Sequence, residues 1–183
     1  MEILYAIFLI LFVSLSPIFG FFLAKSTKEE QKYAKTYLSS AFVVVFAILF
    51  ALILNISLGN IYLFLIFIIV GVLFSFFIKE YLFYLGIIFF SSLNNSDNLI
   101  FLISVFVFLL NIIIGIFYYN INQKFTAIKR QLLFFVMPII LYLSSLGTLL
   151  DTAALTPIGL GGVLGLMLKQ KGNKAKPSSK KKR

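Results

Sequence analysis

The 183-residue chain contains no cysteine, no histidine and no tryptophan, and only six of its residues are acidic. The lack of cysteine and histidine excludes thiolate nucleophiles, histidine general bases, disulfides and zinc sites built from those ligands. Enzymes at membranes generally use paired carboxylates, a histidine or a metal centre, whereas the acids here are dispersed. We therefore expect a protein that is not an enzyme, with no catalytic residue, no metal site and no cofactor.

Charge of either sign is scarce, at 12% of the residues, while hydrophobic residues make up 61% and the mean hydropathy is +1.07. Soluble domains are about half apolar and about a quarter charged. Because lipid offers the backbone no hydrogen-bond partner, a chain this apolar must satisfy its own peptide groups. The composition predicts an all-α, multi-pass transmembrane helical bundle over residues 1–168, embedded in the lipid bilayer of the cell membrane.

Seven apolar segments can be distinguished in the sequence: 2–24, 37–58, 61–78, 81–92, 99–120, 131–150 and 153–168. A helix that crosses the hydrocarbon core needs roughly 20 residues, so the fourth and seventh segments are short. The first segment begins at Glu2 without a basic region before it, and we expect a retained span rather than a cleaved signal. The count predicts about seven spans, with the N-terminus outside and the C-terminus in the cytoplasm.

The distribution of positive charge agrees with this count. If all seven segments cross, all 16 lysines and arginines fall on one side, in 25–36, 79–80, 121–130 and 169–183. Such an excess marks the cytoplasmic side of membrane proteins. If the fourth and seventh segments both fail to cross, only the loop 121–130 is misplaced, so a five-span bundle is the alternative.

The C-terminal tail, residues 169–183, carries eight positive charges and no acid. Its composition predicts a disordered cytoplasmic segment that contacts anionic lipid headgroups. No aromatic residue is interleaved among these charges to stack on bases, so we expect no specific binding of nucleic acid.

Small residues recur at four-residue spacing in two segments: Ser16, Gly20 and Ala24 in the first, and Gly161 and Gly165 in the seventh. Such faces let helices approach closely in lipid, where no hydrophobic force drives helices together. Packing within this chain is the simpler interpretation. The alternative is docking onto a membrane protein partner or a second copy of the chain.

Asn111 lies near the centre of the fifth segment, and Ser104 lies seven residues earlier on the same helical face. A polar side chain at this depth usually faces protein or water. An interhelical hydrogen bond is the simpler interpretation, and a polar wall of a substrate path is the alternative. No charged residue accompanies Asn111 inside a span, which argues against a strongly ion-coupled carrier.

The two short segments occupy matching places, because 37–92 and 99–168 each form a triplet that ends in a short element. Paired short or broken helices in inverted repeats mark the binding site of many transporters. Asp97 follows the first triplet and Asp151 precedes the short last segment of the second; both lie on the expected outer side and would flank one vestibule. The alternative is two ordinary short helices in a locally thinned bilayer, with solvated acids.

Taken together, these patterns predict a small transporter or channel-like protein. Its candidate binding residues are Asn111, Ser104, Asn94, Asp97, Asp151 and Thr156. The alternative is a non-catalytic subunit or assembly factor of a membrane complex. A transporter should have water at Asn111 and a pocket under the short segments, whereas a subunit should have a dry Asn111 and an exposed small-residue face.

Overall fold

The computed structural model describes residues 3–27, 31–56, 60–93, 96–122, 132–138 and 152–174. The regular elements in these ranges are helices, which confirms the all-α class. The labelled helices are α1 (Ile3–Ser26), α2 (Gln31–Ile56), α3 (Ile61–Phe74), α4 (Tyr81–Ser92), α5 (Asp97–Asn122) and α8 (Thr152–Lys174). Residues 132–138 are also helical.

Three of the described helices are long and apolar enough to cross a membrane. The qualifying stretches are Ile7–Ser26, Thr36–Asn55 and Asp97–Tyr119. Helices α3 and α4 are apolar but have only 14 and 12 residues. The structure therefore supports a membrane protein with helical spans, while the count of seven stays a prediction.

Two helix boundaries differ from the expected segments. The segment 61–78 is helical only to Phe74 and continues into a turn. Helix α8 runs past the expected boundary at residue 168 and ends at Lys174, so the first part of the predicted tail is helical. Lysine and glutamine are good helix formers, which explains why the apolar segment and the charged residues after it form one continuous helix.

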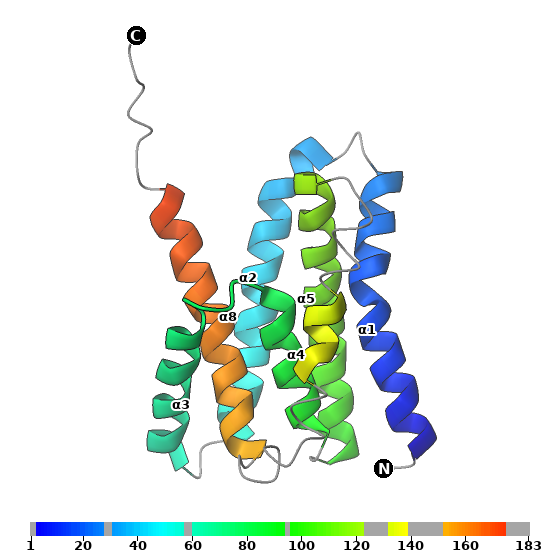
Figure 1. Ribbon diagram of the computed structural model, residues 1–183. Coiled ribbons are helices and arrows are strands. Elements are labelled where there is room, and N and C mark those ends of the chain that lie inside the picture. The colour runs from blue at the N-terminus through cyan, green and yellow to red at the C-terminus, as the bar shows by residue number, and fades with distance from the viewer. Residues whose placement is uncertain are drawn as a thin grey trace.

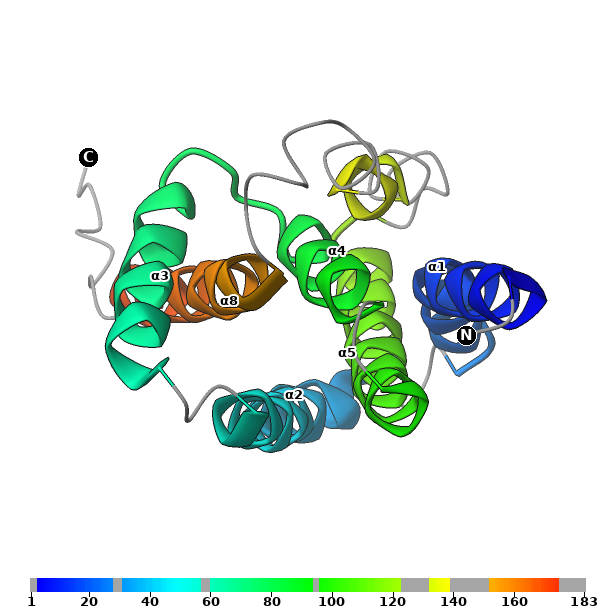
Figure 2. The ribbon, with the colours of Figure 1, turned by 90° about the horizontal axis from the view of Figure 1, so that it is seen from below.

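The arrangement places the lysine-bearing helix ends on one side. The ends of α1 and α8 and the start of α2, which carry lysines, lie at the top of Figure 1 together with the end of α5. Helices α3 and α4 are short and antiparallel, and we call them the hairpin; their connecting residues 75–80 lie below the upper ends of α1, α2 and α5. Helix α8 packs between the two, so that α4 is central and α3 lies at the edge of the bundle (Figure 2).

Helices α1 and α5 form one closely packed pair. A methyl group at Gly20 of α1 would collide with the Ile112 carbonyl oxygen of α5, and one at Gly115 would collide with the Pro17 carbonyl oxygen. The backbones are therefore in contact at two successive points, with a glycine supplied from each side. Close contact of this kind maximises van der Waals packing and stabilises helix pairs in lipid.

Helices α3 and α8 form a second pair by the same rule. Gly71 of α3 lies against the Ile158 carbonyl, and Gly161 of α8 lies against the Ile68 carbonyl. Gly165 lies against the Ser75 side chain one turn further along α8. Both small-residue faces found in the sequence are thus covered by helices of this chain, and Ser16 and Ala24 have no exposed surface.

Helix α2 packs against α5, and it meets the hairpin through aromatic rings. The Phe42 ring lies 5.7 Å from the Tyr81 ring of α4, and the Phe50 ring lies 6.1 Å from the Phe64 ring of α3, both edge to face. Figure 2 shows α2 set apart from α3 and α8. Side chains rather than touching backbones therefore connect α2 to the hairpin.

Helix α4 lies at the centre of the bundle, between α8 and α5 (Figure 2). Ten of its 12 residues are buried. Phe135, from the helical segment 132–138, is fully buried against Phe89 and Phe90 of α4. This enclosure explains why so short a helix is stable, since tertiary packing supplies most helical stability.

We expect Gly20→Ala to destabilise the bundle by about 1–3 kcal/mol, because the added methyl group overpacks the α1–α5 contact. The free energy of unfolding in mixed micelles measures this loss. Ala47→Val, which enlarges an exposed residue of α2, is the control and should change stability little. Equal effects of the two substitutions would contradict the backbone contact.

Candidate functional site

The two short segments of the sequence meet in the structure. The hydroxyl oxygens of Ser91, at the end of α4, and Thr156, in α8, are 2.7 Å apart. Gly159 and Gly162 allow α8 to approach α4 closely, because side chains there would collide with Ile88 and with the Tyr84 ring. Contact between segments 81–92 and 153–168 is what a shared site would require.

The Ser91 hydroxyl has a second hydrogen-bond partner. It lies 3.1 Å from the Ile88 carbonyl oxygen of its own helix, which can accept its proton. Either hydroxyl can be the donor of the Ser91–Thr156 bond, and when Ser91 donates to Ile88, Thr156 donates to Ser91. The two hydroxyls form a short relay that ends on the backbone of α4, at a largely buried position between two helices.

Asn111 makes an interhelical hydrogen bond at the α1–α5 contact. Its Nδ2 donates to the Val13 carbonyl oxygen of α1 over 3.3 Å. Pro17 explains why this carbonyl is available, since proline has no N–H to donate four residues back. Ser16 Oγ donates to the same carbonyl. Asn111 thus supplies a bond that Pro17 cannot make.

Asn111 has no exposed surface, and its Oδ1 has no hydrogen-bond partner among the residues that the structure describes. Ser104, two turns earlier on the same face of α5, is also buried and donates to the Ile100 carbonyl of its own helix over 2.6 Å. The residues expected to form a polar wall on α5 therefore face the closely packed α1. In this conformation they do not line an open path.

The expected outer vestibule can be placed only in part. Asp97 is exposed in the first turn of α5, where its negative charge favours the helix N-terminus. Asn94 and Asp151 lie outside the described residues, so their place in a vestibule stays a prediction. Within the described ranges, no three acidic side chains come together as metal ligands.

A carboxylate contact at the other end of α4 was missed by the sequence reasoning. Tyr118 of α5 donates a 2.7 Å hydrogen bond to Oε2 of Glu80, the residue that precedes α4. Tyr84 donates to the Ile78 carbonyl of the same turn over 2.9 Å. The signal was present in the sequence, because Lys79 and Glu80 join two apolar segments that are both shorter than an ordinary span.

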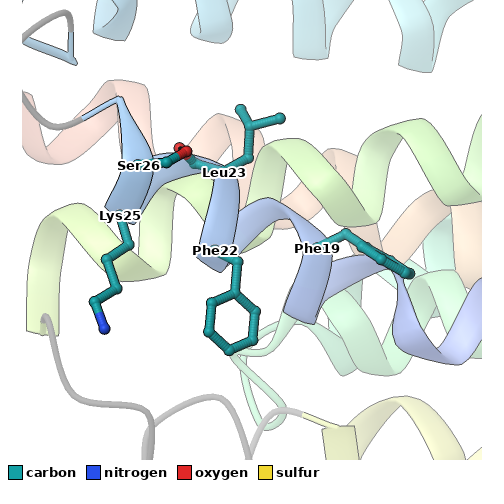
Figure 3. Close-up of a pocket in the computed structure, with 5 residues that line it drawn as sticks. All are labelled: Phe19, Phe22, Leu23, Lys25 and Ser26. Carbon is teal, nitrogen blue, oxygen red and sulfur yellow. The ribbon is translucent and has the colours of Figure 1, made fainter.

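A shallow, open hollow lies on the outer side of α1, near its lysine-bearing end (Figure 3). Its lining residues are Phe19, Phe22, Leu23, Lys25 and Ser26. The hollow is mostly apolar, and its lining includes neither Asn111 nor the Ser91–Thr156 contact. Lipid chains fit such a surface, and we do not assign it to a transported substrate.

The Ser91–Thr156 bond can be measured with a double-mutant cycle of Ser91→Ala and Thr156→Val. We expect a coupling free energy of about 0.6–1.7 kcal/mol, the range for hydrogen bonds between helices in membranes. Unfolding of the four proteins in micelles gives the value. A Ser40→Ala and Thr156→Val cycle, which uses an exposed serine bonded within α2, should give no coupling.

The role of Asn111 can be tested through Pro17. Asn111→Leu should destabilise the protein by about 1–3 kcal/mol, because the Val13 carbonyl loses a donor. In a Pro17→Ala background the alanine N–H can bond that carbonyl, and the loss should be smaller. Thermal unfolding of the four variants compares the two losses, and an equal loss in both backgrounds would contradict this account of Pro17.

No protein-family model matches this chain, and comparison with curated proteins and with solved structures finds no similar one. No relative therefore contributes to the interpretation of the site.

Proposed function

We propose that this protein is a small transporter or channel-like protein of the cell membrane, and that it carries out no chemical step. The observation that carries the proposal is the Ser91–Thr156 contact, which joins the two short helices α4 and α8. In this proposal the α3–α4 hairpin and α8 form the element that a solute passes, with the lysine-rich side in the cytoplasm.

The polar groups at the two ends of α4 shorten the apolar barrier. Ser91 and Thr156 lie at one end of the helix, and Glu80 with Tyr118 lies at the other. The 12 residues of α4 span about 18 Å, whereas the hydrocarbon core is about 30 Å thick. A solute that exchanges hydrogen bonds with these groups would cross less than the full apolar thickness.

In this proposal the interface between α2 and the α3–α4 hairpin is the one that opens. The pairs α1–α5 and α3–α8 are held by glycines against backbone, where a small separation loses many contacts at once. By contrast, α2 meets the hairpin through ring contacts such as Phe42–Tyr81 and Phe50–Phe64. Rotation of these rings can change the α2 interface without separating the glycine pairs.

The alternative is a non-catalytic subunit or assembly factor that docks through its small-residue faces. Those faces are already covered, since Gly20 meets Ile112 and Gly161 meets Ile68 within this chain. A partner would have to bind the exposed large apolar side chains of α1 instead, which lipid covers equally well. The burial of the small residues counts against the subunit class, while the burial of Asn111 counts against a solute path along α5 and leaves the ends of α4 as the polar groups that a path would use.

The proposal can be tested by linking α4 to α8, because the chain has no native cysteine. In Ser91→Cys/Thr156→Cys the two thiols replace hydroxyls that are 2.7 Å apart, and oxidation should cross-link them. We expect vesicles containing the protein to swell faster than empty vesicles in glycine, glycerol, or sodium or potassium salts. Oxidation should abolish the difference, and dithiothreitol should restore it.

The matched control is Ser40→Cys/Thr156→Cys, whose first position is exposed on α2, and oxidation should leave its swelling rate unchanged. Failure of the folded, oriented protein to exceed empty vesicles with any of these solutes would contradict the transport proposal. The subunit alternative would then lead. Swelling that persists in the cross-linked protein would mean that the solute does not pass the α4–α8 contact.

A further inference from the structure

We propose that the turn between α3 and α4 binds the phosphate group of an anionic phospholipid of the cytoplasmic leaflet. Lys79 and Lys169 are the cationic ligands, and Phe76 and Phe77 lie against the acyl chains. The transport proposal uses Glu80 and Tyr118 at this end of α4, whereas this inference uses the exposed side chains of the same turn. The inference requires only that the lysine-rich side of the bundle faces the cytoplasm.

The turn lies inside the boundary between acyl chains and headgroups when the lysine-rich side of the bundle faces the cytoplasm. Glu80 accepts its hydrogen bond from Tyr118, which is at the end of the apolar stretch Asp97–Tyr119 of α5. Residues after this stretch leave the hydrocarbon region, and tyrosine is enriched at this boundary. Figure 1 shows the turn well below the upper ends of the long helices. Long lysine side chains at such a depth extend along apolar surface and bring their ammonium groups to the headgroups.

Two lysines from different elements reach this turn. The Nζ atom of Lys169, on α8, lies 4.9 Å from the centre of the Phe76 ring. Lys79 is exposed three residues after Phe76. The acidic residue of the turn, Glu80, has its carboxylate bound by Tyr118. Within the described ranges, neither lysine has an ion-pair partner, so both ammonium groups can accept an anion.

The aromatic residues of the turn favour a lipid over a free phosphate ion as the ligand. Phe77 is 84% exposed and Phe76 is 59% exposed; Phe76 contacts Lys169, and both rings belong to the turn that carries Lys79. A soluble phosphate would gain nothing from these rings. A phospholipid presents an anion and an apolar chain side by side, which matches the lysines and the rings together.

The test titrates the purified chain in micelles with phosphatidylglycerol, phosphatidylcholine or inorganic phosphate, and counts bound lipid by native mass spectrometry. We expect preferential binding of phosphatidylglycerol. Each lysine near a lipid surface contributes about five-fold in affinity, so Lys79→Gln/Lys169→Gln should lose roughly 25-fold. Because Lys79 is exposed, Lys79→Gln alone keeps the fold and should lose about five-fold.

The matched control, Lys25→Gln/Lys171→Gln, removes the same charge from the same side of the bundle and should keep the affinity. Phe77→Ser should weaken phosphatidylglycerol binding while all lysines remain. Equal losses of phosphatidylglycerol affinity in the test and control variants would overturn the proposal, because general surface charge would then explain the binding. Binding of inorganic phosphate that depends on Lys79 and is insensitive to Phe77→Ser would also overturn it, since the ligand would then be a soluble anion.

Discussion

Close contact between helix backbones at glycine positions determines how this bundle is assembled. In lipid the approach of two helices gains little from hydrophobicity and depends on how well their surfaces fit. Gly20 and Gly115 join α1 to α5, and Gly71 and Gly161 join α3 to α8. The remaining described helices depend on these two pairs: α5 holds the hairpin turn through Tyr118, and α8 holds α4 through Thr156.

The polar groups inside the bundle have two distinct roles. Asn111 compensates for the hydrogen bond that Pro17 removes from α1, and it is enclosed by the glycine contacts around it. The groups at the two ends of α4, by contrast, link different helices around the most buried element. The bond from Asn111 has a structural role, whereas the groups at the ends of α4 place hydroxyls and a carboxylate in positions that a solute could use.

Much of the local structure followed from the sequence, and the partners of each helix did not. The segment 81–92 coincides with α4, because Lys79 and Glu80 on one side and the polar residues after Ser92 on the other end the apolar run. The spacing of Ser16, Gly20 and Ala24 identifies a face for close packing, but a spacing carries no information on which helix covers that face. The sequence predicts an interhelical hydrogen bond from Asn111 but not its acceptor, the Val13 carbonyl, and it gives no sign of the bond between Tyr118 and Glu80, since both bonds join residues far apart in the chain.

The choice of partners has a consequence for biosynthesis. Neither glycine pair joins helices that are neighbours in the sequence, because three helices separate α1 from α5 and still more chain separates α3 from α8. Helices emerge from the ribosome in order, so α1 enters the membrane with its glycine face uncovered until α5 has been made. During this interval the same face is open to any other nascent helix, and a factor that shields it would improve the yield of correctly assembled protein.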